Sequence, residues 1–516
     1  MNGLSADTLN TTPPPPTASC GPALSHPGTA QENLLDVLIV GAGLSGIGAA
    51  RHLQRRCPEH RYAIVEARDA IGGTWDLFRY PGVRSDSDMY TLGYAFKPWQ
   101  HAQAIADGPA ILRYIRETAD EADIGRHIRF GQRVRSAAWC SDQACWTVQI
   151  EDSPTGHKQA VRARFLYLCG GYYSYAGGHR PTFAGEADFG GRVVEPQFWP
   201  AGLDHRNQRV VVVGSGATAV TLVPEMARTA AHVTMLQRSP TYIVNRPSQD
   251  RIAQALIRWL PAGLAYGLAR WKNVLVGRFY FGLARRRPVQ VKQRLVAMAA
   301  RELGPQVDVA RHFTPHYNPW DQRVCVAPDG DLFRAVREGR ASVVTDTIER
   351  FTACGLRLSS GQELAADIVV LATGLKLNVL NDVTLTIDGR PLDASQAMVY
   401  KGMMLSDVPN LALAFGYTNA SWTLKADLTA SYVCRLLRYM QRHGHRSALP
   451  RRDPAVPSQP FLGFTSGYVQ RASDLLPQQG TRKPWRLHQS YLADLLAVRY
   501  GRVRDGVMQF DVKPSA

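Results

Sequence analysis

The pattern of apolar and polar positions predicts two units in which a short buried strand, a glycine-rich turn and a helix follow one another. In the first unit, the apolar run DVLIV at 36–40 leads into the turn GAGLSG at 41–46, and a helical pattern follows over 49–56. Gly41 permits the tight turn, Gly43 lets the backbone approach a pyrophosphate, and Gly46 lets the helix pack closely on the strand. This arrangement predicts a dinucleotide-binding turn.

The next predicted strand, YAIV at 62–65, supports this interpretation because it is followed directly by Glu66. An acidic residue about 20 residues beyond the glycines hydrogen-bonds the adenosine ribose hydroxyls in such folds. The glycine spacing alone is a weak signal. Strand, glycines, helix and terminal acid together are a strong one.

A second unit of the same kind begins with the run RVVVV at 209–213. Its turn has the spacing GxGxxA, and the residues expected at the dinucleotide are Val213, Gly214, Ser215, Gly216, Ala217, Thr218 and Ala219. The following strand, VTML at 233–236, leads into Gln237 and Arg238 instead of an acid, which favours the ribose phosphate of NADPH over NADH. Two such folds that bind nothing are the disfavoured alternative, because glycines at these turns otherwise only cost stability.

In chain order, these units predict an α/β fold with two Rossmann-like dinucleotide-binding domains, the second inserted into the first. The chain begins with a tail rich in Pro, Ser and Thr at 1–34, which we expect to be disordered. The first domain is predicted at 35–185 and again at 345–445, and a linker at 186–208 joins it to the second domain at 209–344. The second domain includes a helical insert at 251–300, and an irregular C-terminal extension follows at 446–516.

Composition narrows the class of protein further. The chain has 516 residues, of which 45% are hydrophobic and 20% charged, so it can bury two or three cores. Its eight cysteines show no repeated short spacing, which argues against a zinc site and a disulfide scaffold and favours a reducing cytoplasm. We expect neither a bound metal nor a membrane-spanning segment, since no run of about 18 apolar residues occurs.

The formal net charge of +17 is concentrated in one stretch, with ten Lys or Arg and no Asp or Glu between Arg251 and Ala300. The same stretch carries Trp259, Trp271 and Phe279 in a helical pattern. A basic, aromatic helix suits peripheral contact with an anionic membrane or an apolar substrate entrance. A helical insert whose basic face is only solvated is an equal alternative. The sequence shows no recognisable nucleic-acid-binding motif, so no nucleic acid partner is expected.

Further motifs lie between and after the two glycine turns. The segments GGTWDL at 72–77 and RYPGVRSD at 79–86 follow the first unit, and FGGRVVEPQFWP at 189–200 joins the two units. Together they resemble the Baeyer-Villiger family of flavin-containing monooxygenases, whose signature is FxGxxxHxxxWP. The similarity continues through QRSP at 237–240, HFTP at 312–315, YNPWDQR at 317–323, IVVLATG at 368–374 and FGYTNASW at 415–422.

Within that family the chain is most similar to the branch that contains EthA and the AlmA-type monooxygenases. The resemblance implies FAD, NADPH and the insertion of one oxygen atom from O2 into ketones, sulfides, thioamides or apolar aliphatic substrates. It assigns FAD contacts to Gly41, Gly43, Ser45, Gly46, Glu66, Thr74, Trp75, Asp76, Leu77, Asp86 and Val134. It assigns NADPH contacts to Arg84, Ser85, Asp86, the turn at 213–219, Gln237 and Arg238.

The resemblance also places Arg323 at the family's catalytic arginine, with Asp86 as the residue that orients it. Oxygen transfer to a carbonyl develops negative charge, and a fixed guanidinium stabilises that charge where water is excluded. Without the flanking motifs, the better interpretation of Arg323 would be a surface ion pair, and that of Asp86 a turn carboxylate.

One residue departs from the family signature, because Glu195 stands at the histidine position. A histidine can donate a ring N–H, whereas an ionised glutamate can only accept hydrogen bonds. The contact between the domains then has to be made differently, and we expect partial release of hydrogen peroxide in place of product. The alternative is that a neighbouring base such as Arg192 pairs with Glu195 and restores the contact.

Several other functions stay open. A flavin-dependent heteroatom or nitrogen hydroxylase, or an AlmA-type alkane hydroxylase, would share both glycine turns. A flavin disulfide reductase would need a cysteine pair spaced like Cys140 and Cys145, but these flank a predicted hairpin turn far from Gly41 in sequence. A catalytically silent protein that binds lipid surfaces is the remaining alternative.

Overall fold

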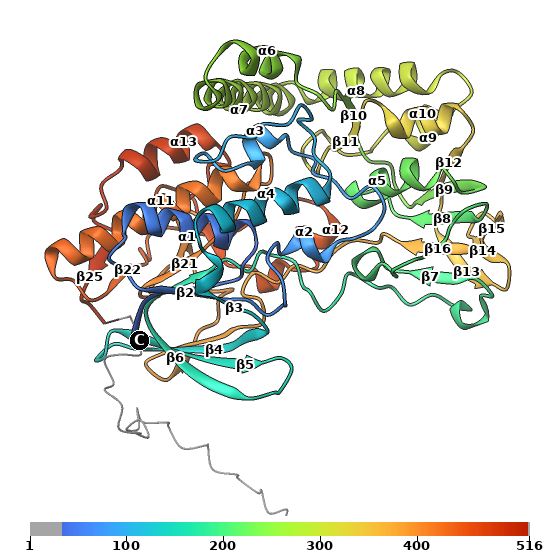
Figure 1. Ribbon diagram of the computed structural model, residues 1–516. Coiled ribbons are helices and arrows are strands. Elements are labelled where there is room, and N and C mark those ends of the chain that lie inside the picture. Colours follow the sequence, from blue (N-terminus) through green and yellow to red (C-terminus); the bar gives the residue numbers. More distant parts are fainter. Residues whose placement is uncertain (1–33, 514–516) are drawn as a thin grey trace, which may run out of the picture.

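Two sheets, one in each half of the molecule, form the framework of the computed structural model, which describes residues 34–513 (Figure 1). The predicted tail lies outside the described residues except for Leu34, which begins the first strand. The first sheet has the strand order β18-β17-β4-β5-β6-β1-β2-β3, with β21 also paired to β6. Its strands are β1 (Leu34–Val40), β2 (Tyr62–Val65), β3 (Ile128–Arg129), β4 (Gln132–Cys140), β5 (Cys145–Asp152), β6 (Lys158–Leu168), β17 (Thr384–Ile387), β18 (Arg390–Pro391) and β21 (Leu411–Leu413).

The second sheet is parallel throughout and has the order β12-β9-β8-β16-β7. Its central strands are buried on both faces, which explains why they are continuous runs of Val, Ile and Leu without alternation. The strands are β7 (Arg192–Val194), β8 (Arg209–Val213), β9 (His232–Gln237), β12 (Ala341–Thr345) and β16 (Ile368–Leu371).

Helices cover both sheets, and one helix follows the glycine turn in each of the two predicted dinucleotide-binding units. The first turn opens α1 (Leu44–Arg56), which packs against the long helix α11 (Trp422–His443), and the second turn opens α5 (Ala217–Met226). The remaining helices around the two sheets are α2 (Thr74–Leu77), α3 (Met89–Leu92), α4 (Gly108–Glu121), α9 (Val309–His312) and α10 (Asp331–Arg337).

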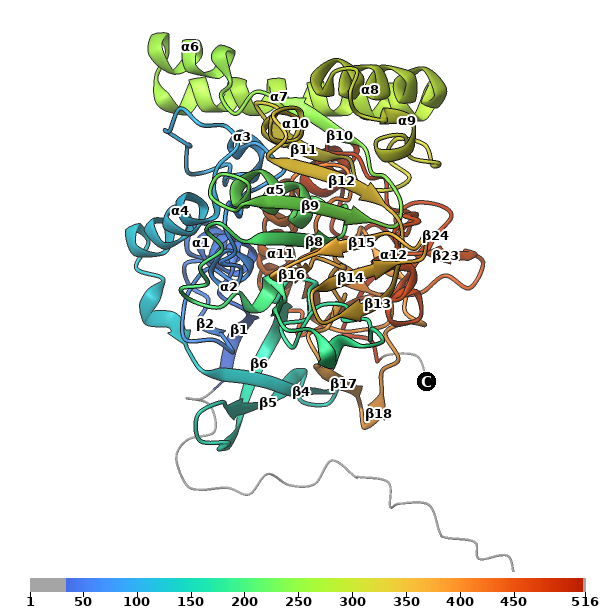
Figure 2. The same ribbon diagram turned by 90° about the vertical axis from the view of Figure 1, so that its right-hand side faces the viewer.

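The predicted insert forms three helices that lie as a layer over one end of the molecule in both views (Figures 1 and 2). These are α6 (Arg251–Trp259), α7 (Ala262–Arg286) and α8 (Pro288–Leu303). Helix α8 packs on α10 of the second domain, whereas α7 packs on α3 of the first. Within residues 34–513, no helix is long and apolar enough to cross a membrane.

The C-terminal extension is largely irregular and is held together by short paired strands. It contains β22 (Ala448–Pro450), β23 (Ser458–Pro460), β24 (Gln478–Gly480), β25 (Met508–Phe510), α12 (Gly467–Gln470) and α13 (Tyr491–Leu495). The other small sheets combine β10 (Ile243–Arg246) with β11 (Cys325–Pro328), β13 (Ile348–Thr352) with β14 (Gly355–Leu358) and β15 (Glu363–Ala365), and β19 (Val399–Tyr400) with β20 (Met404–Leu405).

The domain boundaries differ from the predicted ones at two places. Strand β16 lies in the segment 345–445, which we assigned to the first domain, but it pairs with β8 at the centre of the second sheet. Strand β7 lies in the predicted linker and pairs with the other side of β16. The chain therefore returns to the first domain after β16. The boundary was missed because a four-residue apolar strand does not indicate which of two sheets it joins.

Candidate active site

A cavity with about 1990 Å³ of empty space, including its opening, extends from the first predicted nucleotide-binding turn to the start of α5, which the second turn opens. Residues from both domains line it, so it lies where a reaction between two bound cofactors would take place. The predicted site residues that line the cavity are Gly41, Gly43, Ser45, Glu66, Thr74, Trp75, Arg84, Ser85, Asp86, Val134, Ala217, Thr218 and Arg323.

The first glycine turn fits a pyrophosphate against the start of α1. A Cβ on Gly41 would lie 2.9 Å from the carbonyl oxygen of Cys169, and a Cβ on Gly46 only 1.9 Å from that of Gly41, so both positions require glycine. A Cβ on Gly43 would make only ordinary contact, 3.5 Å from Gly73. Gly43 therefore leaves room for an anion at the helix N-terminus, whereas Gly46 allows the helix and strand to approach.

Glu66 follows β2 directly and holds the same turn in place. Its buried carboxylate accepts hydrogen bonds from the backbone N–H groups of Ala42, at 2.7 Å, and Arg68, at 2.9 Å. Burial raises the pKa of Glu66, and these backbone N–H groups oppose the shift. The residue thus stands where the predicted acid of a ribose site should stand, and it also fixes the position of the glycines.

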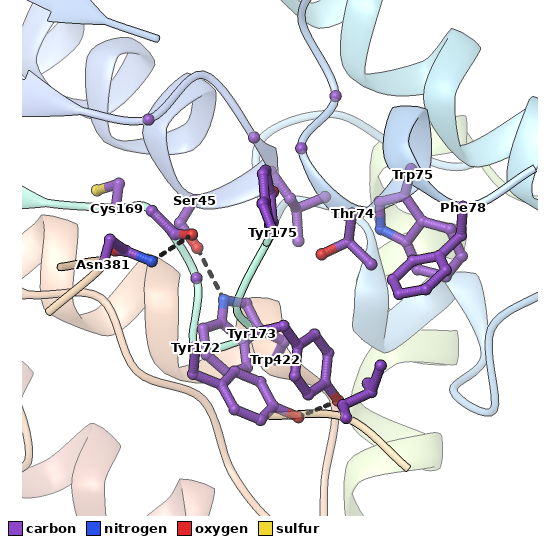
Figure 3. Close-up of a pocket in the computed structure, with 18 of the residues that line it drawn as sticks. Ser45, Thr74, Trp75, Phe78, Cys169, Tyr172, Tyr173, Tyr175, Asn381 and Trp422 are labelled. Atoms are coloured by element: carbon purple, nitrogen blue, oxygen red, sulfur yellow. Dashed lines mark hydrogen bonds between the residues drawn. The ribbon is translucent and has the colours of Figure 1, made fainter. Parts of the chain in front are cut away.

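Asp76 and Leu77, which the resemblance assigned to FAD, do not line this cavity. The Asp76 carboxylate is buried and pairs with Arg68 and, at 3.1 Å, with Arg116. Leu77 packs against the apolar core of the second domain. Both side chains therefore hold α2 in position, and in this short helix it is Thr74 and Trp75 that face the cavity (Figure 3).

The second glycine turn is more open than the first. A Cβ on Gly214, whose φ is +138°, would lie 2.3 Å from the carbonyl oxygen of Ala372, whereas a Cβ on Gly216 would meet nothing within 4 Å. Gly214 therefore serves the packing of the turn, and Gly216 leaves open space at the start of α5. Ser215 donates a hydrogen bond to the Ser239 carbonyl, Val213 ends β8, and Ala219 is buried in the core.

The two residues beyond β9 have different surroundings. Gln237 is buried, and its amide donates to the His312 carbonyl at 2.7 Å and to the Thr345 hydroxyl at 3.0 Å, so its side chain belongs to the domain interior. Arg238 is exposed. Partial burial and repulsion from Arg238 lower the pKa of Arg471, so the like charges of these two arginines interact here.

Arg471 comes from the C-terminal extension and was missed because nothing in that stretch marks it as a binding residue. Two neighbouring cations at the surface form a suitable place for a phosphate.

Arg84 is the residue that most directly indicates an anion-binding position in the cavity. Its Nη1 donates to Asp331 at 2.5 Å, across the boundary between the two domains. Its Nε and Nη2 are buried without a hydrogen-bond partner within the described residues. Such groups cost free energy unless a ligand satisfies them, so the cavity fits an anionic dinucleotide at this point.

Arg323 lies in the cavity among phenol groups. Its Nη2 donates to the hydroxyl of Tyr172 at 3.4 Å, and the Tyr172 and Tyr173 hydroxyls are 2.6 Å apart. Tyr172 raises the pKa of Arg323 well above its usual value, and Tyr173, Tyr468 and Asp86 add to this against the opposing effect of burial. The guanidinium is partly buried and stays charged as arginine does in proteins, and a fixed positive charge is what stabilising a developing oxyanion requires.

Asp86 is the acidic group that faces this arginine. Burial raises the pKa of Asp86, and the nearby charges of Arg323 and Arg84 oppose that shift. No direct hydrogen bond joins Asp86 to Arg323 among the described contacts, so the carboxylate acts on Arg323 through its field.

Tyr172, the hydrogen-bond partner of Arg323, stacks on Trp422 beside Ser45 of the first glycine turn (Figure 3). The ring of Trp422 stacks on that of Tyr172 at a centroid distance of 4.8 Å, and its Nε1 donates to the Ser45 hydroxyl at 2.7 Å. The sequence identified Ser45 and Arg323 but assigned no role to Tyr172 or Trp422, because ring stacking between distant segments leaves no local pattern.

The cysteine pair of the disulfide-reductase alternative does not reach this cavity. Cys140 and Cys145 face each other across the predicted β4–β5 hairpin, and Cys169 is the only cysteine of residues 34–513 that lines the cavity. No group of three or more His, Cys, Asp or Glu side chains suited to a metal ion occurs in that part of the chain.

Glu195 has a basic partner, but not the expected one. Its carboxylate lies 3.2 Å from Nε of Arg180, and both side chains are about one-third exposed. Arg180 also pairs with Glu186. Arg192, the partner suggested by sequence proximity, lies on β7 and is exposed.

Comparisons with known proteins agree with this geometry. The flavin-binding monooxygenase-like family model matches residues 95–258, and an NAD(P)-binding Rossmann-like model matches residues 39–107. The FAD-containing monooxygenase EthA of Mycobacterium tuberculosis is 54% identical over 93% of this chain and 98% of its own length. The probable FAD-binding monooxygenase AlmA of Acinetobacter baylyi is 49% identical over 93% and 97%.

Solved structures show the same fold at low sequence identity. OTEMO in complex with FAD and NADP matches with a TM-score of 0.70 and 20% identity, over 92% of this chain and 99% of that chain. An oxidised steroid monooxygenase bound to NADP matches with a TM-score of 0.71 and 21% identity over the same shares. With relatives near half identity along almost its whole length, this chain belongs to the flavin-binding monooxygenase-like family and is an oxidoreductase of that family.

Proposed function

We propose that this enzyme is an FAD- and NADPH-dependent monooxygenase of the Baeyer-Villiger type, which inserts one oxygen atom from O2 into ketones. Sulfides and thioamides are further substrates of the same chemistry, and the preferred substrates are apolar or long-chain. One observation carries the proposal: a permanently charged Arg323, flanked by Asp86 and phenols, lies in the cavity that extends from the first glycine turn to the start of α5.

The residues present fit both cofactors. FAD would lie along the first turn, with its pyrophosphate at Gly43, its ribose at Glu66 and further contacts at Thr74, Trp75 and Val134. NADPH would lie along the second turn, with Arg84 and Arg238 as its charge partners. When bound, the flavin accepts hydride from NADPH and activates dioxygen.

Arg323 is the group that this chain contributes to the oxygen transfer itself. Negative charge develops on a carbonyl oxygen as a new bond to its carbon forms, and a fixed cation lowers the energy of that state. The hydrogen bond to Tyr172, whose ring stacks on Trp422, helps to keep Arg323 in place. A preorganised donor of this kind contributes on the order of 3 to 4 kcal/mol to such steps.

The walls around Arg323 indicate the substrate class. Tyr172 and Trp422 line the cavity together with Arg323, and Phe415 and Phe461 pack behind them. The rings of Tyr172 and Trp422 offer apolar surface in the same cavity as the charged Arg323. An apolar chain with one polarisable oxygen or sulfur fits this arrangement better than a polar metabolite does.

A substrate panel tests the proposal. Purified enzyme with bound flavin is supplied with NADPH and air and offered long-chain ketones, cyclic ketones, sulfides, thioamides, amines and alkanes, and the oxygenated product is measured instead of NADPH loss. Esters from ketones are expected. Alcohols from alkanes alone would indicate the alkane hydroxylase alternative, N-hydroxylated amines the heteroatom hydroxylase, and a colourless protein that consumes no NADPH the silent lipid-binding one.

A further inference from the structure

Helix α7 is apolar on two opposite faces, and one of them is exposed. The inner face packs on the first domain through Ala265, Ala269 and Val274, which are all buried. The outer face carries a stripe of Leu264, Leu268, Trp271, Leu275 and Phe279, each between 41% and 64% exposed. These positions follow the i, i+4, i+7, i+11, i+15 spacing of a single helix face. A helix that is apolar all round is normally buried all round, so this stripe requires a cover.

Helix α6 extends the exposed apolar surface. Ile252 and Trp259 are 59% and 78% exposed, and with Ala255 they share one side of that helix. Helices α6 and α7 lie together at one end of the molecule, and no other element of residues 34–513 lies over their outer sides (Figures 1 and 2). We call the exposed sides of α6 and α7 the apolar face.

Positive charge surrounds the apolar face, and few carboxylates neutralise it. Residues 251–300 contain ten Lys or Arg and no acid. Ion pairs to carboxylates elsewhere in the described chain involve Lys272, Arg285 and the buried Arg270. Arg258, Arg278 and Arg286 are exposed without such a pair, and helical spacing places Arg278 and Arg286 beside the stripe on α7.

We infer that the apolar face docks the enzyme on an anionic lipid bilayer, with Leu and Trp side chains in the interfacial layer and arginines at the headgroups. Interfacial helices combine apolar and cationic side chains in this way. A second copy of this chain is disfavoured as the cover, because two identical faces would bring uncompensated positive charge against positive charge.

Hydrogen bonds on the inner face of α7 fix the position of this helix and therefore of its exposed apolar stripe. Arg270 donates to the backbone carbonyls of Tyr90, at 2.9 Å, and Gly93, at 2.7 Å, and Asn273 donates to Asp88 at 3.0 Å. These contacts tie α7 to α3, whose Leu92 lines the cavity. If the proposed apolar substrates are correct, docking would place the cavity close to a bilayer that dissolves them. The docking itself does not depend on that function.

Flotation of the flavin-loaded, full-length enzyme with vesicles tests the inference. Vesicles of phosphatidylcholine with phosphatidylglycerol should bind the enzyme at low salt, and raising the salt or omitting phosphatidylglycerol should weaken binding, because each Lys or Arg near the surface contributes about fivefold in affinity. The double variant Leu268→Glu, Leu275→Glu should bind about tenfold more weakly or worse. Leu475→Glu, at an exposed leucine in the C-terminal extension outside the apolar face, is the control and should bind normally.

Flavin content and NADPH oxidation without vesicles should be unchanged in all variants, which separates a docking defect from misfolding and from failure of the proposed function. Absence of binding to phosphatidylglycerol vesicles at low salt would overturn the inference. So would equal binding by the double variant, or a self-association of the wild type that the double variant abolishes, since the cover would then be a second copy.

Discussion

Replacement of Arg238 by alanine should damage the use of NADPH and spare the use of NADH. Arg238 follows β9, where enzymes that use NADH carry an acid, and its charge adds to burial in lowering the pKa of Arg471. The ribose phosphate of NADPH would relieve the repulsion between these two cations. NADH lacks that phosphate and gains nothing from either residue.

The size of the effect follows from the exposure of Arg238. A hydrogen bond between charged groups contributes about 1.5 to 3 kcal/mol, and solvent screening at an exposed side chain favours the lower part of that range. Arg238→Ala should therefore lower kcat/KM for NADPH about tenfold, mostly through KM, and kcat/KM for NADH less than twofold. Arg471→Ala should act in the same direction, and the double variant should lose less than the product of both effects, since the two guanidinium groups share one phosphate.

Initial rates of nucleotide oxidation at fixed substrate and saturating oxygen measure this. Arg228→Ala is the matched control, because Arg228 is an exposed arginine of the same domain that pairs with Glu225. It should leave both nucleotides unaffected. An equal loss with NADPH and NADH in Arg238→Ala would refute the assignment of Arg238 to the phosphate.

Three further predictions concern the cavity and the domain contact. Arg323→Ala should still bind FAD but form at least about a hundredfold less ester or sulfoxide. Near-native product would exclude Arg323 as the stabilising cation, and Tyr172→Phe, which loses only the phenol contact, should be affected less. Burial raises the pKa of Asp86, so kcat/KM should fall as the pH is lowered through that pKa and the carboxylate is protonated. Asp86→Asn should have low activity that no longer falls as the pH is lowered. If the fall at low pH is unchanged in this variant, it is caused by the protonation of another group. Glu195→His should raise the amount of product formed per NADPH oxidised and lower the release of hydrogen peroxide, because the native Glu195–Arg180 contact would hold the domains together only loosely. If the native enzyme already converts NADPH to product without peroxide release, and histidine brings no gain, Arg180 restores the contact.

The two glycine turns could be predicted from the sequence because the strand, turn and helix that form each one are neighbours along the chain. Strand, turn and helix follow one another within about 25 residues, and the required glycines at Gly41, Gly46 and Gly214 are explained by backbone contacts that any such turn makes. Arg323 and Asp86 could be identified only through the family resemblance, since neither lies in a pattern that physical reasoning alone assigns to catalysis.

Features that depend on distant contacts could not be predicted. The partner of β16 is decided by which sheet has an open edge, and the sequence of four apolar residues does not contain that information. Gln237 lies beside Arg238 in sequence, yet its amide is used by His312 and Thr345. The positive stretch at 251–300 was visible in the composition, but only the packing of α7 shows that an apolar stripe remains exposed.

The central claim is that one atom of dioxygen enters an apolar substrate at Arg323 at the expense of NADPH. The most direct measurement uses isotopically labelled dioxygen, the purified yellow enzyme, NADPH and a long-chain ketone, with mass spectrometry of the product. The account predicts an ester that carries one labelled oxygen atom for each NADPH productively consumed, and loss of that ester in Arg323→Ala. An unlabelled product, or NADPH oxidation that yields only hydrogen peroxide with every substrate of the panel, would contradict it.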